Sequence, residues 1–179
     1  MTYVETLLKG AYIIDMQPIE DERGWFSRAF CMKEFRANGL CSEFVQHNSS
    51  FNLQKGTVRG LHYQLPPYEE IKVVRCIRGK IFDVIVDIRK DSDTYLKWFG
   101  VELSEDNCRM LYVPKGFAHG FQTLCDKTEI FYLMSEFYRK GYDAGLRWDD
   151  KAIGIDWPIR DGIVISEKDA SFGYVETQP

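Results

Sequence analysis

Hydrophobic and polar residues alternate along much of the chain, in short runs separated by turns. The clearest alternation spans residues 44–50 and 71–77. A period of two places successive side chains on opposite faces of an extended backbone, so each run predicts a β-strand. Residues 80–89 are rich in β-branched side chains, which favour the same structure. Further segments with alternating or β-branched residues predict strands at residues 11–16, 57–64, 98–103, 109–113, 129–135 and 163–166.

Turn and helix signals fill the intervals between these strands. Arg78-Gly79-Lys80 lies between two strong strand signals, which predicts that residues 71–77 and 80–89 form a hairpin. Residues 33–38 end at Gly39, which is typical of a short helix with a glycine stop. Residues 141–158 show no regular period, so we expect irregular structure there.

Short strands at regular intervals with few helices predict an all-β sandwich or barrel. A jelly-roll barrel is the natural choice, because its interior can hold a small ligand. No repeat, low-complexity tract or linker divides the sequence, so we expect one domain over residues 1–179.

Composition narrows the class of protein. A hydrophobic content of 45% over 179 residues is enough for a buried core. The formal net charge of −4 gives no reason to expect nucleic-acid binding, and no apolar run is long enough to cross a membrane. The opening residues do not form a signal peptide. The five cysteines are spread out without a C-x-x-C motif, which favours free thiols in the cytoplasm.

Residues 57–64 gather more chemically active side chains than any other stretch. Regular alternation would place Arg59 and Tyr63 on one face of a strand and His62 on the other. A bulge at Gly60 would relax that division, because glycine in a strand often marks one. The stretch is either a hydrogen-bonded polar patch at a strand end or a centre for anion binding and proton transfer.

The sequence contains three histidines, His47, His62 and His119, and a single histidine is more often structural than catalytic. Small β-barrels can hold a metal with two histidines and a carboxylate. Such a site usually begins with two ligands one residue apart, and His62-Tyr63-Gln64 lacks the second. We therefore expect no metal, although a metal-dependent enzyme stays open as an alternative.

Acid–base chemistry without a metal remains available. His62 could take a proton, with Asp169 or Asp83 orienting its ring. Tyr132 or Tyr138 on a facing strand could return a proton.

Cations could serve the same chemistry. Lys72 could stabilise an oxyanion that forms when a proton leaves the carbon next to a carbonyl. Arg59 and Arg23 could hold phosphates, and Phe26 could stack on a base. The alternative for these cations is an ordinary solvated strand face.

The sequence resembles the RmlC family, the dTDP-4-dehydrorhamnose 3,5-epimerases of the cupin superfamily. The resemblance covers nearly the whole chain, and the ordered set of runs is far more specific than any one of them. These runs are Asp21–Phe26, Phe44–Asn48, Val58–Gln64, Lys72–Arg75, Phe82–Arg89, Pro114–Phe121, Arg147–Asp150, Ile155–Pro158 and Ser166–Asp169.

The resemblance implies a cupin-type jelly roll (a double-stranded β-helix with a few short helices) and a cofactor-free isomerase. The expected substrate is a nucleotide-linked 4-keto-6-deoxyhexose, which is inverted at C3 and C5 through an enolate. By position, His62 matches the general base, Asp169 its partner, Tyr132 the general acid and Lys72 the lysine near the C4 oxygen.

A second set of residues is expected to bind the substrate. Family members are homodimers in which the segment around Arg23 reaches the partner's site, so we expect the same here. Arg28 stands where many members have a glutamate, which leaves CDP- and GDP-linked sugars open beside dTDP. The expected binding residues are Arg23, Phe26, Arg28, Gln46, His47, Asn48, Arg59, His119, Tyr138, Asp143 and Lys168.

Three other functions stay open at this point. Relatives that invert only C3 or only C5 would carry the same residue types. A metal-dependent cupin and a non-catalytic sugar-binding barrel are the remaining alternatives.

Overall fold

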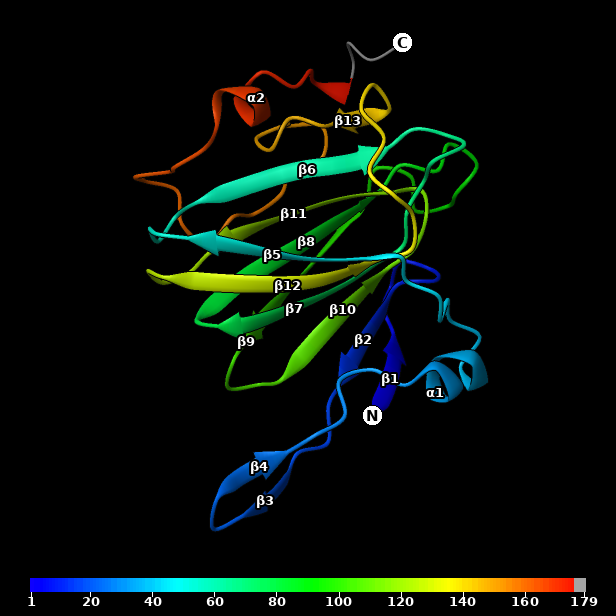
Figure 1. Ribbon diagram of the computed structural model, residues 1–179. Coiled ribbons are helices and arrows are strands. Elements are labelled where there is room, and N and C mark those ends of the chain that lie inside the picture. The colour runs from blue at the N-terminus through cyan, green and yellow to red at the C-terminus, as the bar shows by residue number, and fades with distance from the viewer. Residues whose placement is uncertain (176–179) are drawn as a thin grey trace.

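The structure is a computed structural model that describes residues 1–175, and its strands build two main sheets that face each other (Figure 1). The larger sheet has six strands in the order β1 (Thr2–Glu5), β2 (Tyr12–Asp15), β10 (Arg109–Val113), β7 (Lys72–Arg78), β12 (Thr128–Met134) and β5 (Gln46–Asn52). The smaller has five in the order β13 (Asp143–Gly145), β6 (Val58–Gln64), β11 (Phe117–Thr123), β8 (Lys80–Asp87) and β9 (Trp98–Ser104).

The remaining elements lie outside these sheets. Strands β3 (Ile19–Asp21) and β4 (Gly24–Phe26) pair only with each other, and the two helices are α1 (Met32–Ala37) and α2 (Glu167–Ala170). No helix among residues 1–175 is both long enough and apolar enough to cross a membrane.

The prediction of an all-β fold with few short helices is confirmed. The two sheets, however, are separate and are not closed into a barrel. Their facing sides enclose the largest part of the core, to which both sheets contribute fully buried side chains such as Val74, Leu111, Ile81 and Ile85. Each such side chain stabilises the fold by about 1.5–3 kcal/mol through burial.

The predicted hairpin of residues 71–77 and 80–89 is wrong. β7 pairs with β10 and β12 in the larger sheet, whereas β8 pairs with β11 and β9 in the smaller one. The turn at Gly79 therefore carries the chain from one sheet to the other. Both strands are central and largely buried on both faces, and a turn signal alone does not say whether the chain stays in one sheet.

A bulge interrupts β6 at Gly60. Arg59 pairs with Phe121 and His62 pairs with His119, so two residues of β6 lie opposite one residue of β11. The bulge changes which side chains share a face. Instead of facing opposite ways as strict alternation requires, Arg59 and His62 both face the larger sheet, where Arg59 meets β5 and His62 shares a cavity with β12.

Only glycine fits at the bulge. Gly60 has a φ of +114°, and a Cβ built there would lie 2.7 Å from both the Cα of Gly120 and the carbonyl oxygen of His119. Both are backbone atoms, which cannot move aside as a side chain can.

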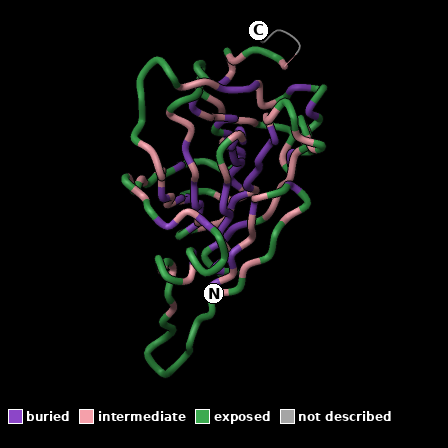
Figure 2. Tube along the Cα trace, turned by 90° about the vertical axis from the view of Figure 1, so that its right-hand side faces the viewer, coloured by how far each residue is buried: buried purple, intermediate pink, exposed green. Residues whose placement is uncertain are grey.

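β11 escaped the sequence patterns although it has seven residues, because it is buried along its whole length and shows no alternation. Several other elements escaped them because they are too short to show a period. These are β1, the hairpin of β3 and β4, β13 and α2. The expected strand at 163–166 is present only as an isolated bridge between Thr57 and Val164. The β3–β4 hairpin projects from the body of the molecule, and nearly all of its residues are exposed (Figure 2).

Substituting Gly60 with alanine should lower the free energy of unfolding by more than the ~1–3 kcal/mol that backbone strain alone costs, because a backbone clash is added. Urea denaturation measures this loss. Gly141→Ala is the matched control, since Gly141 has a φ of +90° but open space around its Cβ position. Equal losses in both variants would contradict a steric requirement at the bulge.

Candidate active site

A cavity of about 230 Å³ lies between the ends of the two sheets, beside α2. Most of its lining residues were predicted from the sequence. The lining comprises Gln46, Asn48, His62, Tyr63, Gln64, Glu70, Lys72, Tyr132, Met134, Tyr138, Asp143, Ala144 and Lys168.

Asp169 holds His62 at one wall of this cavity. Its Oδ1 lies 2.8 Å from His62 Nε2, and its Oδ2 accepts a hydrogen bond of 3.0 Å from the backbone N–H of Gly60. Asp169 lies in α2, whose N-cap Ser166 accepts a hydrogen bond from the Asp169 N–H with its Oγ, at 3.1 Å. One carboxylate thus connects the helix, the bulge and the imidazole.

The pKa of the Asp169 carboxyl is below its ordinary value. Burial acts to raise this pKa, but the hydrogen bonds from His62 and Gly60 and the nearby imidazole outweigh it. The carboxylate is therefore ionised at neutral pH and accepts from Nε2–H. That tautomer leaves the lone pair on Nδ1 of His62, as a general base requires.

The His62 side chain is 42% exposed on its cavity side and is supported from behind by an aromatic ring. Phe172 packs edge-on against the imidazole, with ring centroids 5.8 Å apart. This contact depends on Gly145, which pairs with His62, because a Cβ at Gly145 would lie 2.4 Å from the Phe172 ring. Phe172 had no signal in the sequence.

Lys72 reaches the cavity from β7 and is buried. Its Nζ donates to the carbonyl oxygen of His62 at 3.3 Å and lies 3.1 Å from Glu70 Oε1. The ammonium group therefore belongs to the same cluster as the imidazole.

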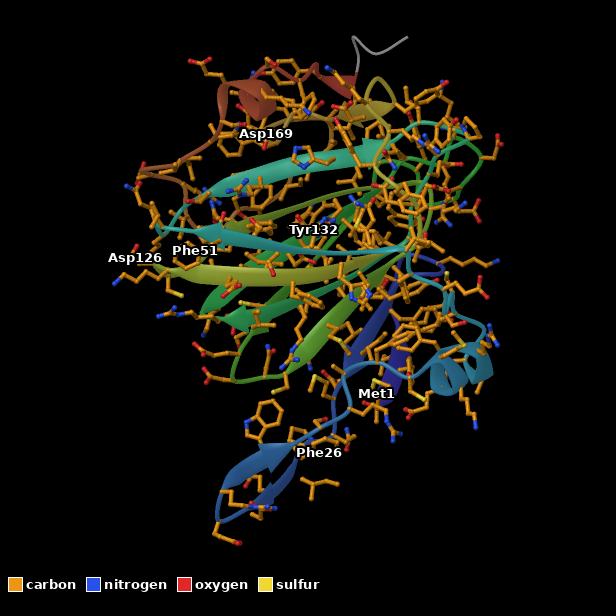
Figure 3. All side chains as sticks on the ribbon, in the orientation of Figure 1. Met1, Phe26, Phe51, Asp126, Tyr132 and Asp169 are labelled. Carbon is orange, nitrogen blue, oxygen red and sulfur yellow. The ribbon has the colours of Figure 1, made fainter. Side chains whose placement is uncertain are left out.

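Tyr132 lies on the sheet that faces His62. It comes from β12, where it pairs with Asn48 of β5, and the figure places it across from Asp169 on α2 (Figure 3). Burial raises the pKa of its phenol, and Arg59 partly opposes this. Arg59 itself donates from Nε to Asn52 Oδ1 at 2.7 Å.

Polar contacts fix the mouth of the cavity. Asp143 Oδ2 lies 2.7 Å from Lys168 Nζ, and Asp143 Oδ1 accepts from the Tyr138 hydroxyl at 3.2 Å. Lys168 is the main reason why the pKa of Asp143 falls to about 2, and the N–H of Gly141 adds to it. Gln46 Oε1 accepts from the Tyr138 N–H at 2.7 Å.

The structure separates the two candidate partners of His62. Asp83 is fully buried and lies 2.8 Å from His119 Nε2 rather than near His62. Asp169 is thus the carboxylate beside His62. His119 sits directly across the strand pair from His62 but does not line the cavity.

Besides His119 and Arg59, four expected binding residues of this chain do not line the cavity. His47 lies on the other face of β5, against Phe131, because it alternates with Gln46 and Asn48. Arg28 is paired with Glu34 at 2.9 Å. Arg23 and Phe26 lie on the projecting β3–β4 hairpin. Figure 3 shows Phe26 far from Tyr132 and Asp169.

Five lining residues were not predicted as site residues, and they include Gln64, Met134 and Glu70 beside Tyr63 and Ala144. Gln64 is buried and joins two loops, donating to the Tyr68 carbonyl at 2.8 Å and accepting from the Arg139 N–H at 2.7 Å. Met134 follows Tyr132 on the same face of β12, and Glu70 carries a buried carboxylate. A buried Gln or Glu gives no periodic signal that separates it from a surface residue.

A larger cavity of about 410 Å³ shares Tyr63, Gln64 and Glu70 with the first. Its lining contains no histidine, whereas the smaller cavity is lined by His62. Within residues 1–175, no three His, Cys, Asp or Glu side chains converge in a way that would hold a metal ion.

Replacing His62 with alanine should raise the pKa of Asp169, because it removes a hydrogen bond that lowers it and leaves burial, which raises it. Carboxyl ¹³C NMR of labelled aspartate measures both titrations. In the wild type the midpoint should lie below 3.8. Because folding lowers this pKa, the associated stability is present above pH 3.8 and is lost as pH falls through the folded-state value. An unchanged midpoint in His62→Ala would contradict the pairing.

Comparison with known proteins identifies the family of this chain. The family model described as dTDP-4-dehydrorhamnose 3,5-epimerase matches residues 5–176. A protein of that name from Methanothermobacter thermautotrophicus is 46% identical over 179 residues, covering 99% of this chain and 96% of its own.

Solved structures show the same fold. The dTDP-4-dehydrorhamnose 3,5-epimerase from Bacillus anthracis, with TDP and pyrophosphate bound, has a TM-score of 0.94 and 40% identity, over 97% of this chain and 99% of its own. The enzyme from Legionella pneumophila, in complex with dTDP-4-keto-L-rhamnose, has a TM-score of 0.93 and 36% identity, over 98% and 93%. The chain therefore belongs to the dTDP-4-dehydrorhamnose 3,5-epimerase family.

Proposed function

We propose that this protein is an isomerase that inverts C3 and C5 of dTDP-4-keto-6-deoxy-D-glucose to give dTDP-4-keto-L-rhamnose. The observation that carries the proposal is the placement of His62 with Asp169 on one side of a cavity and Tyr132 on the other. An epimerase needs this arrangement, because a proton leaves one face of a carbon and another arrives on the opposite face. Family membership supports the choice of substrate.

In this proposal His62 is the general base. The 4-keto group acidifies the protons on C3 and C5, and Nδ1 of His62 accepts one of them. Asp169, ionised and 2.8 Å from Nε2, stabilises the imidazolium that forms. Phe172 packs against the imidazole of His62, and the Gly60 N–H donates to Asp169. Together these contacts limit rotation of the two side chains.

Lys72 stabilises the enolate. When a proton leaves C3 or C5, the electron pair moves into a carbon–carbon double bond and the C4 oxygen becomes negative. The buried ammonium group of Lys72 lies beside the base. It stabilises this negative charge strongly, because little water is present to screen the interaction.

Tyr132 returns the proton from the opposite face. Its phenol is neutral at physiological pH, and burial, which raises its pKa, favours that protonated form further. It gives its proton to carbon as the enolate collapses to the ketone, and solvent restores the tyrosine and the histidine. One proton leaves and one arrives at each centre, so no cofactor is required by the balance of the reaction.

The nucleotide end of the substrate needs cations and a stacking surface. Lys168 lines the sugar cavity, and Arg59 lies close enough to Tyr132 to lower the pKa of its phenol, so both cations suit the phosphates. We propose that the protein is a homodimer in which Arg23 and Phe26 of one subunit complete the site of the other, since the hairpin that carries them projects with exposed apolar side chains. We also propose a cytoplasmic location, where sugar nucleotides are made.

Inversion of a single centre is the second candidate. It uses the same base, acid and oxyanion site and differs only in whether the sugar ring turns to offer its second carbon. The relatives at 40% identity or more favour two centres. The number of carbons that exchange their protons with solvent separates the two.

His62→Ala should reduce turnover of dTDP-4-keto-6-deoxyglucose by roughly 10²–10⁴-fold, as expected for the loss of a general base. The affinity for dTDP, measured by calorimetry, should change little, since His62 faces the sugar. Turnover like that of the wild type would remove His62 from this role.

Tyr132→Phe should retain proton abstraction but lose correct reprotonation. In deuterium oxide this variant should still exchange substrate protons while forming little inverted product, which proton NMR resolves. Unchanged product formation would mean that Tyr132 is not the acid.

Mixing two inactive variants tests the shared site. Arg23→Ala combined with Phe26→Ala removes what one subunit gives to its partner, and His62→Asn removes the base. If the hairpin acts in trans, a mixed dimer has one intact site, so equal amounts of both variants should recover about a quarter of the wild-type turnover (half the dimers are mixed, each with one of two sites intact). Absence of recovery, with dimers confirmed by ultracentrifugation, would contradict the exchange.

A further inference from the structure

Glu70 is a buried carboxylate to which the proposed reaction assigns no role. Its side chain is only 5% exposed, and Oε1 lies 3.1 Å from Lys72 Nζ. The other oxygen, Oε2, is buried and has no hydrogen-bond partner among the described residues. Because a buried charge is costly unless it is paired, Lys72 is the group that compensates Glu70.

The backbone on both sides of Glu70 is anchored. The Ile71 N–H donates to Ser135 Oγ at 2.7 Å, and the Ser135 N–H donates to the Ile71 carbonyl at 3.0 Å. On the other side, the Gln64 side chain donates to the Tyr68 carbonyl at 2.8 Å. The carboxylate is therefore presented to Lys72 by a segment that is fixed at two points.

Lys72 has a flexible four-carbon stem, and its ammonium group has three N–H donors. The His62 carbonyl accepts from one of them at 3.3 Å, and the Glu70 carboxylate lies at ion-pair distance, 3.1 Å from Nζ. These two contacts hold the ammonium group in place, while it still lines the cavity where a ligand would bind. With the His62 carbonyl alone, the ammonium could turn about its stem.

We propose that Glu70 is a positioning residue that, through its ion pair, aims an N–H of Lys72 at the C4 oxygen of the sugar. The inference rests on the proposed function, since that function supplies the oxyanion. Glu70 touches no substrate in this scheme. Its acceptor oxygen sets the geometry of Lys72, and a misdirected donor loses most of its effect on a developing charge.

Glu70→Ala should lower kcat by roughly 10- to 100-fold with little change in KM or in dTDP affinity. Glu70→Gln keeps an acceptor oxygen and should stay within about threefold of the wild type. In a Lys72→Ala background, Glu70→Ala should add less than about a twofold loss, because its effect passes through Lys72. Glu102→Ala is the matched control, since it removes an exposed Lys–Glu pair with Lys80 at 3.2 Å.

A second measurement does not depend on activity. NMR of ¹⁵Nζ-labelled lysine reports whether an ammonium is held in hydrogen bonds and protected from exchange. The Lys72 signal, assigned by its absence in Lys72→Ala, should be protected in the wild type and in Glu70→Gln and lost in Glu70→Ala.

These outcomes distinguish a failure of the positioning role of Glu70 from a failure of the proposed function. Wild-type kcat in Glu70→Ala, an equal loss in the Lys72→Ala background, or a Glu70→Gln variant as impaired as Glu70→Ala would each overturn the positioning role. If the wild type does not exchange substrate protons but the Lys72 signal responds as expected, the proposed function fails while the placement of Lys72 by Glu70 stands.

Discussion

The geometry of the site depends on the contact between the Asp169 carboxylate and the bulged backbone at Gly60. Asp169 is nearly inaccessible to solvent, so its negative charge would be energetically costly without partners. His62 and the N–H of Gly60 compensate this charge by hydrogen bonds to the carboxylate. The Gly60 N–H can do so because the bulge opens β6 at that point. A side chain at Gly60 would collide with the backbone of β11 and displace both partners of the carboxylate. The conformation of one glycine thus links the packing of the smaller sheet to the orientation of the imidazole.

The two sheets carry the two groups proposed to act on opposite faces of the sugar. The proposed base, His62, comes from β6 in the smaller sheet, and the proposed acid, Tyr132, comes from β12 in the larger one. Because buried side chains of both sheets hold them together, the separation of His62 and Tyr132 is fixed by the core rather than by a loop. At the mouth, Asp143 of β13 binds both Lys168 of α2 and Tyr138 of the loop that precedes β13.

Sequence patterns predicted most of the long strands, because these alternate or are rich in β-branched residues. They missed β11, which is buried along its whole length and shows no alternation. They failed where long-range pairing decides the outcome. A turn at Gly79 says nothing about which sheet receives the next strand, and alternation put Arg59 and His62 on opposite faces until the bulge was known. His62, Lys72 and Tyr132 were identified through resemblance and residue chemistry, and the structure places them at one cavity. Glu70 and Phe172 were missed, since their importance lies in which neighbours they touch.

Proton NMR of dTDP-4-keto-6-deoxyglucose with the wild-type enzyme in deuterium oxide tests the central claim most directly. A base and an acid on opposite sides of one cavity predict that solvent deuterium enters both C3 and C5 as dTDP-4-keto-L-rhamnose forms. Exchange at a single carbon would make this a one-centre epimerase. No exchange at either carbon would contradict the assignment of His62 and Tyr132 to proton transfer on this substrate.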